Sequence, residues 1–298
     1  MKKKILIIGF GNMGLSHFGS FNKKNFEIDI VDKKNKIDVI KKNRTFNQNV
    51  KFFKKIPRYK NYLLTIFATQ SKERFNLVKK FYAYNSTKFL LLEKFCFLKL
   101  VDFIKFNELF KKKSKTFINS WSYLLARKIK IKNKLNTFTL HCQIEDGSML
   151  ANITHIMHIF SFLNNNSDLQ MTHKTNFKVV KSSRRKNYDE IIGNIKIEDV
   201  NKNILNISTK KRMKYSMIFS IKQKFTKKIY KFKIKKNHLV SYQSPSKKKF
   251  EIQFPFSKIT SGIFLKNCEK KNFRYMPSFD DDYKLSTFFL EKFKVKIP

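Results

Sequence analysis

Residues 2–14, Lys2-Lys3-Lys4-Ile5-Leu6-Ile7-Ile8-Gly9-Phe10-Gly11-Asn12-Met13-Gly14, decide the fold of this 298-residue chain. A short apolar run that ends at a glycine is typical of a buried strand. The glycines that follow fit the G-x-G-x-x-G pattern of a strand–loop–helix turn that holds a pyrophosphate. Gly9, Gly11, Gly14 and Gly19 are four of only seven glycines in the chain, so a chance cluster explains them poorly.

Each glycine of the pattern has its own physical reason. Gly9 permits the tight turn out of the strand, Gly11 lets the backbone approach phosphate oxygens, and Gly14 lets the next helix pack closely. The N–H groups at the start of that helix favour an anion. We therefore predict that a nucleotide cofactor binds at Gly9, Phe10, Gly11, Asn12, Met13 and Gly14. A purely structural turn with no nucleotide is the alternative.

A carboxylate follows the second predicted strand. Residues 26–31 alternate apolar and acidic side chains, as a strand would, and Asp32 comes next. Dinucleotide-binding folds hold the adenosine ribose with an acid about 20 residues beyond the glycines. Asp32 therefore favours NAD, because it would repel the 2′-phosphate of NADP, although Lys33 and Lys34 could soften that preference. A surface aspartate with no such role is the alternative.

The rest of the first 118 residues continues the strand–helix alternation. Such a series predicts a parallel, doubly wound sheet, and ligands bind at the carboxyl ends of its strands. Thr69, Gln70, Glu93 and Lys94 follow two of these strands, so they should face one crevice with the glycine loop. The expected strands are residues 50–53, 62–68, 88–92 and 116–119, and the expected helices are residues 15–21, 71–81 and 102–110.

Beyond residue 118 the pattern changes to period-two alternation. Alternating strands joined by polar turns predict a mostly antiparallel sheet with one packed face and one lysine-coated face. One helix, residues 147–163, interrupts the strands, and Ser278 with the acids after it should cap a closing helix. The expected strands are residues 128–132, 137–144, 177–180, 195–197, 204–208, 215–221, 229–234 and 250–254. We thus expect a dinucleotide-binding α/β Rossmann domain at 1–118 and an α+β substrate and oligomerisation domain at 119–298.

The formal net charge of +44 invites a nucleic-acid function. The basic residues are almost all lysine, however, and they are spread along the whole chain. Recognition of phosphates and bases favours arginine in one stripe or patch. Lysine is enriched together with Phe, Ile and Asn, which are the residues that A+T-rich codons supply. We therefore predict no specific nucleic-acid partner, with only salt-sensitive, non-specific affinity for polyanions.

Membrane and disulfide classes are also excluded by the sequence. No uninterrupted apolar stretch reaches the roughly 18 residues that cross a bilayer. The three cysteines, Cys96, Cys142 and Cys268, are far apart and odd in number, which fits a reducing compartment and no disulfide framework. We expect a cytoplasmic protein without a membrane partner.

Three motifs together resemble the Gfo/Idh/MocA family of NAD(P)-dependent oxidoreductases. They are the glycine loop at 9–14, Ala68-Thr69 after one strand and Glu93-Lys94 after the next. The resemblance implies a bound NAD, with NADP possible, held by the loop, Asp32, Thr69, Glu93 and Lys94. Gln70 and Phe95 stand where the family has prolines, which fix the backbone φ angle.

Residues 147–163 are similar to the active-site helix of that family, with the glycine at Gly147. His155 aligns with the family histidine, whereas Asn152 and His158 stand where aspartates are usual. The resemblance implies that His155 exchanges the substrate hydroxyl proton while hydride moves at the nicotinamide, and that Lys94 lies beside both. A histidine with a pKa near neutrality suits that work. Asn152 could orient the imidazole but could not stabilise an imidazolium as a carboxylate does.

Two alternatives stand beside that role. His155 could be a satisfied histidine of a domain interface, and His155 with His158 has a metal-ligand spacing. No carboxylate or cysteine lies close by in sequence to complete a metal site, so we predict no metal. The resulting hypothesis is an oxidoreductase that acts on a hydroxyl or carbonyl of a sugar, sugar nucleotide or polyol. It would self-associate through its C-terminal sheet, as the resemblance implies. The rival hypothesis is a catalytically impaired descendant that serves in binding or interaction.

Overall fold

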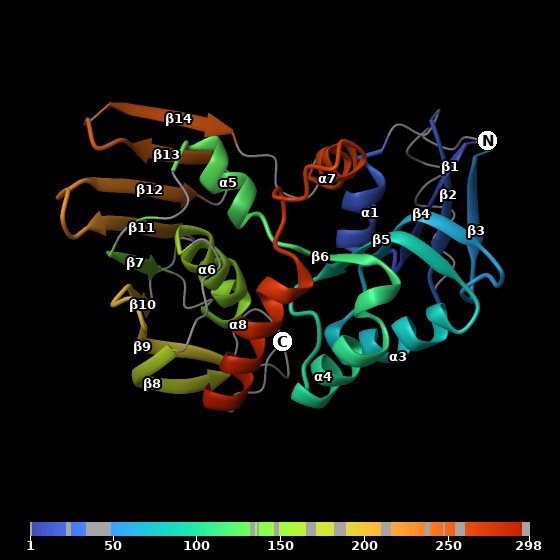
Figure 1. The fold of residues 1–298 in the computed structure, drawn as a ribbon, viewed down its shortest axis with the longest axis horizontal. Helices are drawn as coiled ribbons and strands as arrows, with labels where there is room; N and C mark the ends of the chain where they lie inside the picture. The colour runs from blue at the N-terminus through green and yellow to red at the C-terminus, as the bar shows by residue number, and fades with distance from the viewer. Residues whose placement is uncertain are drawn as a thin grey trace. The chain divides into compact units, whose positions relative to one another are not determined.

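The computed structural model forms two compact units, and each is described by itself (Figure 1). The first unit comprises residues 1–121 and 255–283, and the second comprises residues 122–254 and 284–298. Residues 255–283 thus belong to the first unit although they follow the strands of the second, unlike a simple division after residue 118. The structure describes residues 2–21, 25–33, 49–131, 135, 137–145, 149–164, 171–181, 189–209, 216–235, 239–246, 248–253 and 260–293.

The first unit contains a six-stranded parallel sheet, which confirms the predicted doubly wound fold. Its strand order is β3-β2-β1-β4-β5-β6. Strands β2 and β3 therefore lie on one side of β1, and β4, β5 and β6 lie on the other side. A topological switch of this kind leaves a crevice at the carboxyl ends of β1 and β4. The strands are β1 (Lys3–Ile8), β2 (Phe26–Val31), β3 (Val50–Phe53), β4 (Asn61–Phe67), β5 (Ser86–Glu93) and β6 (Lys115–Asn119).

Helices cover this sheet because its central strands are apolar on both faces. The sequence did not predict α7, yet α7 packs against α1 and the sheet in one cluster that includes Phe18, Phe117 and Phe264. Gly262 permits that approach, since a Cβ there would lie 2.4 Å from the carbonyl oxygen of Ser20. The helices of the unit are α1 (Asn12–Phe18), α3 (Ser71–Tyr82), α4 (Leu100–Leu109), the 3₁₀ turn η1 (Lys111–Lys113) and α7 (Thr260–Glu269).

The last helix, α8 (Phe279–Phe293), begins directly after Ser278, the predicted cap residue. The Asp281 carboxylate accepts the Ser278 N–H at 2.8 Å, and the Ser278 hydroxyl accepts the Asp281 N–H at 3.2 Å. This reciprocal pair satisfies two N–H groups at a helix start and confirms the predicted cap.

The second unit contains an eight-stranded, mostly antiparallel sheet, also as predicted. Among the described strands, β7 and β10 pair in parallel and the other neighbours pair antiparallel. The order is β14-β13-β12-β11-β7-β10-β9-β8. The strands are β7 (Phe138–Ile144), β8 (Met171–Lys181), β9 (Asp189–Asp199), β10 (Ile204–Thr209), β11 (Ser216–Gln223), β12 (Ile229–Lys235), β13 (Leu239–Gln243) and β14 (Lys249–Gln253).

The helix predicted over residues 147–163 is present as α6 (Met149–Leu163), and Gly147 and Ser148 lie outside the described residues. The strand predicted at 128–132 is wrong, because α5 (Ser122–Lys128) ends there and Lys132 lies outside the described residues. Lys130 adopts a left-handed φ of 53°, Ile131 N–H bonds Ala126 C=O, and Lys130 N–H bonds Arg127 C=O. These are the bonds of a Schellman helix end, which buries Ile129 and Ile131 while Lys130 is exposed. The alternating burial is therefore real, but a helix end produces it.

No described helix is both long and apolar enough to span a bilayer. Within the same residues, no three His, Cys, Asp or Glu side chains are grouped so that they could hold a metal ion.

Candidate functional site

The glycine loop joins β1 to α1 at the topological switch of the first sheet. Gly9 has a φ of +91°, and a Cβ there would lie 2.8 Å from the carbonyl oxygen of Ala68. A Cβ on Gly14 would lie 2.0 Å from the carbonyl oxygen of Gly9. A Cβ on Gly11, by contrast, would meet nothing within 4 Å. The fold itself therefore requires glycine at positions 9 and 14, whereas Gly11 faces open space.

Asp32 lies against this loop. It follows β2, and its Oδ2 accepts the backbone N–H of Phe10 at 2.6 Å. The Gly9 N–H donates to the carbonyl of Val31 at 2.8 Å, so the loop and the end of β2 are held together. Lys33 forms an exposed ion pair with Glu73, with its Nζ 3.4 Å from the Glu73 carboxylate. Lys34 lies outside the described residues.

Thr69 and Gln70 follow β4 at the same edge. The Ala68 N–H donates to the Ile8 carbonyl at 2.8 Å, which ties this segment to the end of β1. The Thr69 Oγ1 is buried and has no hydrogen-bond partner among the described residues, while Gln70 is exposed. Gln70 is the N-cap residue of α3 and makes no capping bond with its side chain. Ser71 is the first residue of α3, as predicted, and its hydroxyl donates to the Phe95 carbonyl at 2.6 Å.

Glu93 is the last residue of β5, and its carboxylate is buried in a polar network. Its Oε1 lies 2.6 Å from His17 Nε2 and accepts the Asn119 side-chain amide at 2.6 Å. The other ring nitrogen of His17 lies 2.5 Å from the Ser261 hydroxyl. Burial would raise the pKa of Glu93, but hydrogen bonds from His17 and Asn119, with the charges of His17 and Arg74, outweigh it and lower the pKa. The half-buried Lys94 follows directly.

Sequence reasoning missed His17, Arg74 and Ser261, which surround Glu93 and the residues after it. His17 and Ser261 are fully buried, and Arg74 is nearly so. The one available signal was the chemistry of the residues themselves: a histidine on an apolar helix, and one of only eight arginines among 65 basic residues. Neither pattern identifies a partner, because the partners lie far away in sequence.

The predicted active-site helix, α6, belongs to the second unit. Asn152, His155 and His158 are all buried, and the spacing of three residues places Asn152 and His155 on one face of the helix. The carbonyl of His155 accepts the Ser122 hydroxyl at 2.6 Å, which ties α6 to α5. Gly147 and Ser148 lie outside the described residues.

A buried carboxylate lies at the start of α6, although it does not come from position 152, where an aspartate is usual in the family. The buried carboxylate of Glu190, in β9, accepts the Leu150 N–H at 3.0 Å. A carboxylate at a helix N-terminus satisfies an unpaired donor and complements the helix dipole. Glu190 thus fixes the start of the helix that carries Asn152 and His155.

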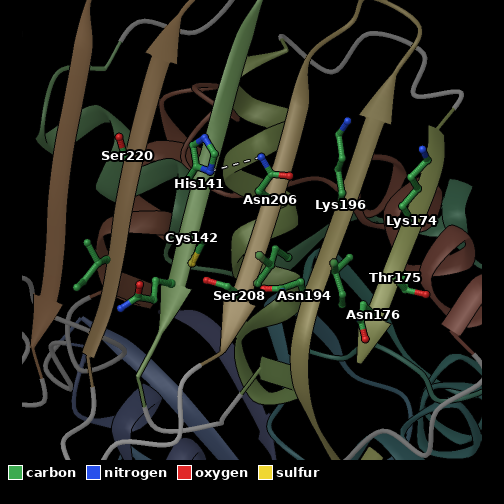
Figure 2. A pocket seen from close by; sticks show the side chains of 14 residues that line it. His141, Cys142, Lys174, Thr175, Asn176, Asn194, Lys196, Asn206, Ser208 and Ser220 are labelled. Carbon is green, nitrogen blue, oxygen red and sulfur yellow. Dashed lines mark hydrogen bonds between the residues drawn. The ribbon is translucent and has the colours of Figure 1, made fainter. Parts of the chain in front are cut away.

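A hollow of about 650 Å³ lies on the outer face of the second sheet, and Figure 2 shows the side chains that line it. Its lining comes from β8, β9, β10, β7 and β11, and none of the described lining residues is acidic. Lys174 lies directly opposite Lys196, and the Asn206 amide contacts His141 at 3.4 Å. None of the predicted site residues lines this hollow.

Comparisons with known proteins found likeness in structure but not in sequence. No family model matches the chain, and no curated protein sequence does. The solved structure of GenD2 from gentamicin A biosynthesis, in complex with NAD, is 9% identical with a TM-score of 0.69, over 97% of this chain and 92% of GenD2. UDP-N-acetylglucosamine 3-dehydrogenase GnnA from Acidithiobacillus ferrooxidans is 8% identical with a TM-score of 0.65, over 98% of this chain and 96% of GnnA.

A third similar structure is that of the transcriptional regulator Gal80p from Kluyveromyces lactis. It is 10% identical with a TM-score of 0.67, over 99% of this chain and 89% of Gal80p. At such identities the likeness establishes the fold along nearly the whole chain.

Proposed function

We propose that the protein is a nicotinamide-dependent oxidoreductase of the Gfo/Idh/MocA type that acts on a hydroxyl or carbonyl of a sugar, sugar nucleotide or polyol. The observation that carries the proposal is the open space over Gly11, between two glycines that the fold itself requires. Backbone there can approach a pyrophosphate without a side chain in the way. Two of the similar structures support the same function: GenD2 is in complex with NAD, and GnnA is named as a dehydrogenase of a sugar nucleotide, UDP-N-acetylglucosamine.

The described residues fit a dinucleotide. Gly9, Gly11 and Gly14, with the backbone of Phe10, Asn12 and Met13, would face the pyrophosphate. Asp32 would accept a ribose hydroxyl beside its bond from Phe10, which favours NAD over NADP. The buried, unpartnered hydroxyl of Thr69 is a further polar group at this edge. When bound, the nicotinamide would supply the hydride acceptor or donor.

The proposed chemistry of the chain is proton transfer and positioning. His155 would take the proton from a substrate hydroxyl at its imidazole, or return it in the reverse direction. Asn152, on the same face of α6, would orient that ring. Without a carboxylate to stabilise the imidazolium, the rate would fall on the order of 10²-fold below that of an enzyme with the aspartate. Glu93 would hold the backbone beside Lys94, whose ammonium would lie next to the substrate and the nicotinamide.

Titration of the purified protein with NADH and NADPH, followed by cofactor fluorescence, tests the cofactor half. We expect both to bind, and NADH to bind more tightly because of Asp32. If neither cofactor binds, the oxidoreductase proposal is wrong.

Turnover on a panel of sugars, sugar nucleotides and polyols with bound cofactor tests the catalytic half. His155→Asn should abolish turnover and leave cofactor affinity unchanged. His141→Asn, on the exposed outer face of the second sheet, is the matched control and should change neither.

A second candidate is a binding protein that has lost catalysis. Asn152 in place of an acid favours it, and so does the likeness to the transcriptional regulator Gal80p. Cofactor binding without turnover on the panel, together with an Asn152→Asp variant that remains inactive, would support this candidate over the enzyme.

A further inference from the structure

Arg74, in the first turn of α3, is among the largest fully buried side chains of the described residues and is 1% exposed. Its Nη1 lies within hydrogen-bonding distance of three carbonyl oxygens, at 2.5 Å from Glu93, at 2.9 Å from Cys96, and close to Phe95. Its Nη2 donates to the carbonyl of Thr69. One guanidinium therefore contacts both segments that leave the carboxyl ends of β4 and β5.

These contacts all lie in the two segments that follow β4 and β5. The carbonyls of Glu93, Phe95 and Cys96 lie on either side of Lys94, and that of Thr69 precedes α3. The planar guanidinium has donors in a fixed fork, so it can hold several acceptors in one relative geometry, which a lysine ammonium cannot do. The hydroxyl of Ser71 adds a second donor to the Phe95 carbonyl at 2.6 Å.

The burial of this cation is costly, and its surroundings offset part of the cost. Burial lowers the pKa of Arg74 from its ordinary value, and the nearby Cys96 and Glu93 oppose the shift. The buried carboxylate of Asp282 opposes it as well. Because a buried ion pair is often no more stabilising than apolar side chains of similar volume, net stability explains poorly why a cation stands here. Fixing one local conformation explains it better.

We propose that Arg74 is a positioning residue for the cofactor edge: its guanidinium holds Thr69 and the residues on both sides of Lys94 in one conformation. The inference rests on the proposed function for its consequence, which is cofactor affinity. Gln70 and Phe95 lack the fixed φ of proline at these two segments. The hydrogen bonds of the Arg74 side chain therefore fix the conformation of these segments, which no proline fixes.

Three variants test this role in the full-length chain. Arg74→Met removes the donors at similar volume, Arg74→Lys keeps the charge but not the fork, and Lys79→Met is the control on the exposed face of the same helix. The measurements are NADH affinity by fluorescence and amide hydrogen exchange over residues 93–97. We expect Arg74→Met to weaken NADH binding on the order of tenfold and to speed exchange in this segment. Arg74→Lys should recover part of both, and Lys79→Met should change neither.

A folded Arg74→Met protein that keeps wild-type affinity overturns the inference, whether or not its exchange changes. If Arg74→Met does not fold, Ser71→Ala takes its place, because it removes the other donor to the Phe95 carbonyl. Unchanged exchange and affinity in both Ser71→Ala and Arg74→Lys would then contradict the proposal. If the wild-type protein itself binds no NADH, the proposed function fails, and the exchange rates alone decide whether Arg74 holds these segments.

Discussion

At the scale of the residue, Glu93 shows how distant groups set the charge of one side chain. Its carboxylate would be neutral in an apolar interior, yet His17 and Asn119 bond it directly. Those contacts overcome burial and lower its pKa below the ordinary value of 4.5. The ionised form is therefore the one that the folded protein stabilises.

Glu93→Gln tests this assignment through the pH dependence of stability. A carboxyl whose pKa is lowered by folding stabilises the protein above its unfolded pKa, and the contribution is lost as the pH falls through the folded pKa. We expect the variant to lose about 1–3 kcal/mol of unfolding free energy in urea at neutral pH. The difference from wild type should shrink as the pH drops below 4.5.

The matched control is Glu73→Gln, because Glu73 is exposed and pairs only loosely with Lys33. It should change stability by less than about 0.5 kcal/mol at either pH. A Glu93→Gln difference that stays constant with pH would contradict the ionised, hydrogen-bonded carboxylate.

At the scale of the element, the turn between β1 and α1 separates structural from functional glycines. Gly9 and Gly14 are confined by backbone atoms, whereas Gly11 is open and has an ordinary φ of −72°. The same motif therefore contains positions that the fold needs and one position that the fold does not need.

Gly14→Ala and Gly11→Ala should separate these roles. The first places a Cβ 2.0 Å from the Gly9 carbonyl oxygen, so we expect a loss of about 1–3 kcal/mol or more in chemical unfolding. The second should leave stability within about 1 kcal/mol of wild type. It should nevertheless abolish NADH binding, because its methyl group would occupy the space where the phosphate approaches. Wild-type affinity in Gly11→Ala would contradict the assignment of that space to the cofactor.

At the scale of the whole molecule, the net charge of +44 dominates the electrostatics. Like charges repel throughout the compact chain, and in the second sheet Lys174 even lies directly opposite Lys196. Added salt shortens the screening length to about 8 Å at physiological ionic strength. Self-repulsion should therefore fall as salt rises.

Thermal unfolding at low, physiological and high sodium chloride concentrations tests whether charge repulsion destabilises the folded protein. We expect the midpoint to rise by several degrees between about 0.01 M and 0.15 M salt and then to level off. A parallel measurement of heparin binding should show affinity at the low salt concentration and its loss at the high one. A midpoint that is flat or falls with salt would show that charge repulsion is not a significant term.

Much of this architecture could be predicted from local pattern. The strand and glycine turn at residues 5–14 and the alternation of the second half predicted both sheets, because side-chain periodicity reports which face of an element is buried. The same rule failed at residues 128–132, where a Schellman helix end buries alternate isoleucines in the same way. It also gave no sign of α7, whose role depends on packing against α1 and the first sheet.

The sequence by itself determined the parallel sheet and its order of elements, the antiparallel sheet, the α6 helix and the chemistry available at residues 9–14, 69 and 93–94. Tertiary structure alone decided which buried groups meet there. His17 and Asn119 bond the Glu93 carboxylate, Ser261 contacts the other ring nitrogen of His17, and Arg74 joins the carbonyls after β4 and β5. The physical reason is that burial makes these polar contacts obligatory, whereas their partners lie up to 244 residues apart and no local period links them.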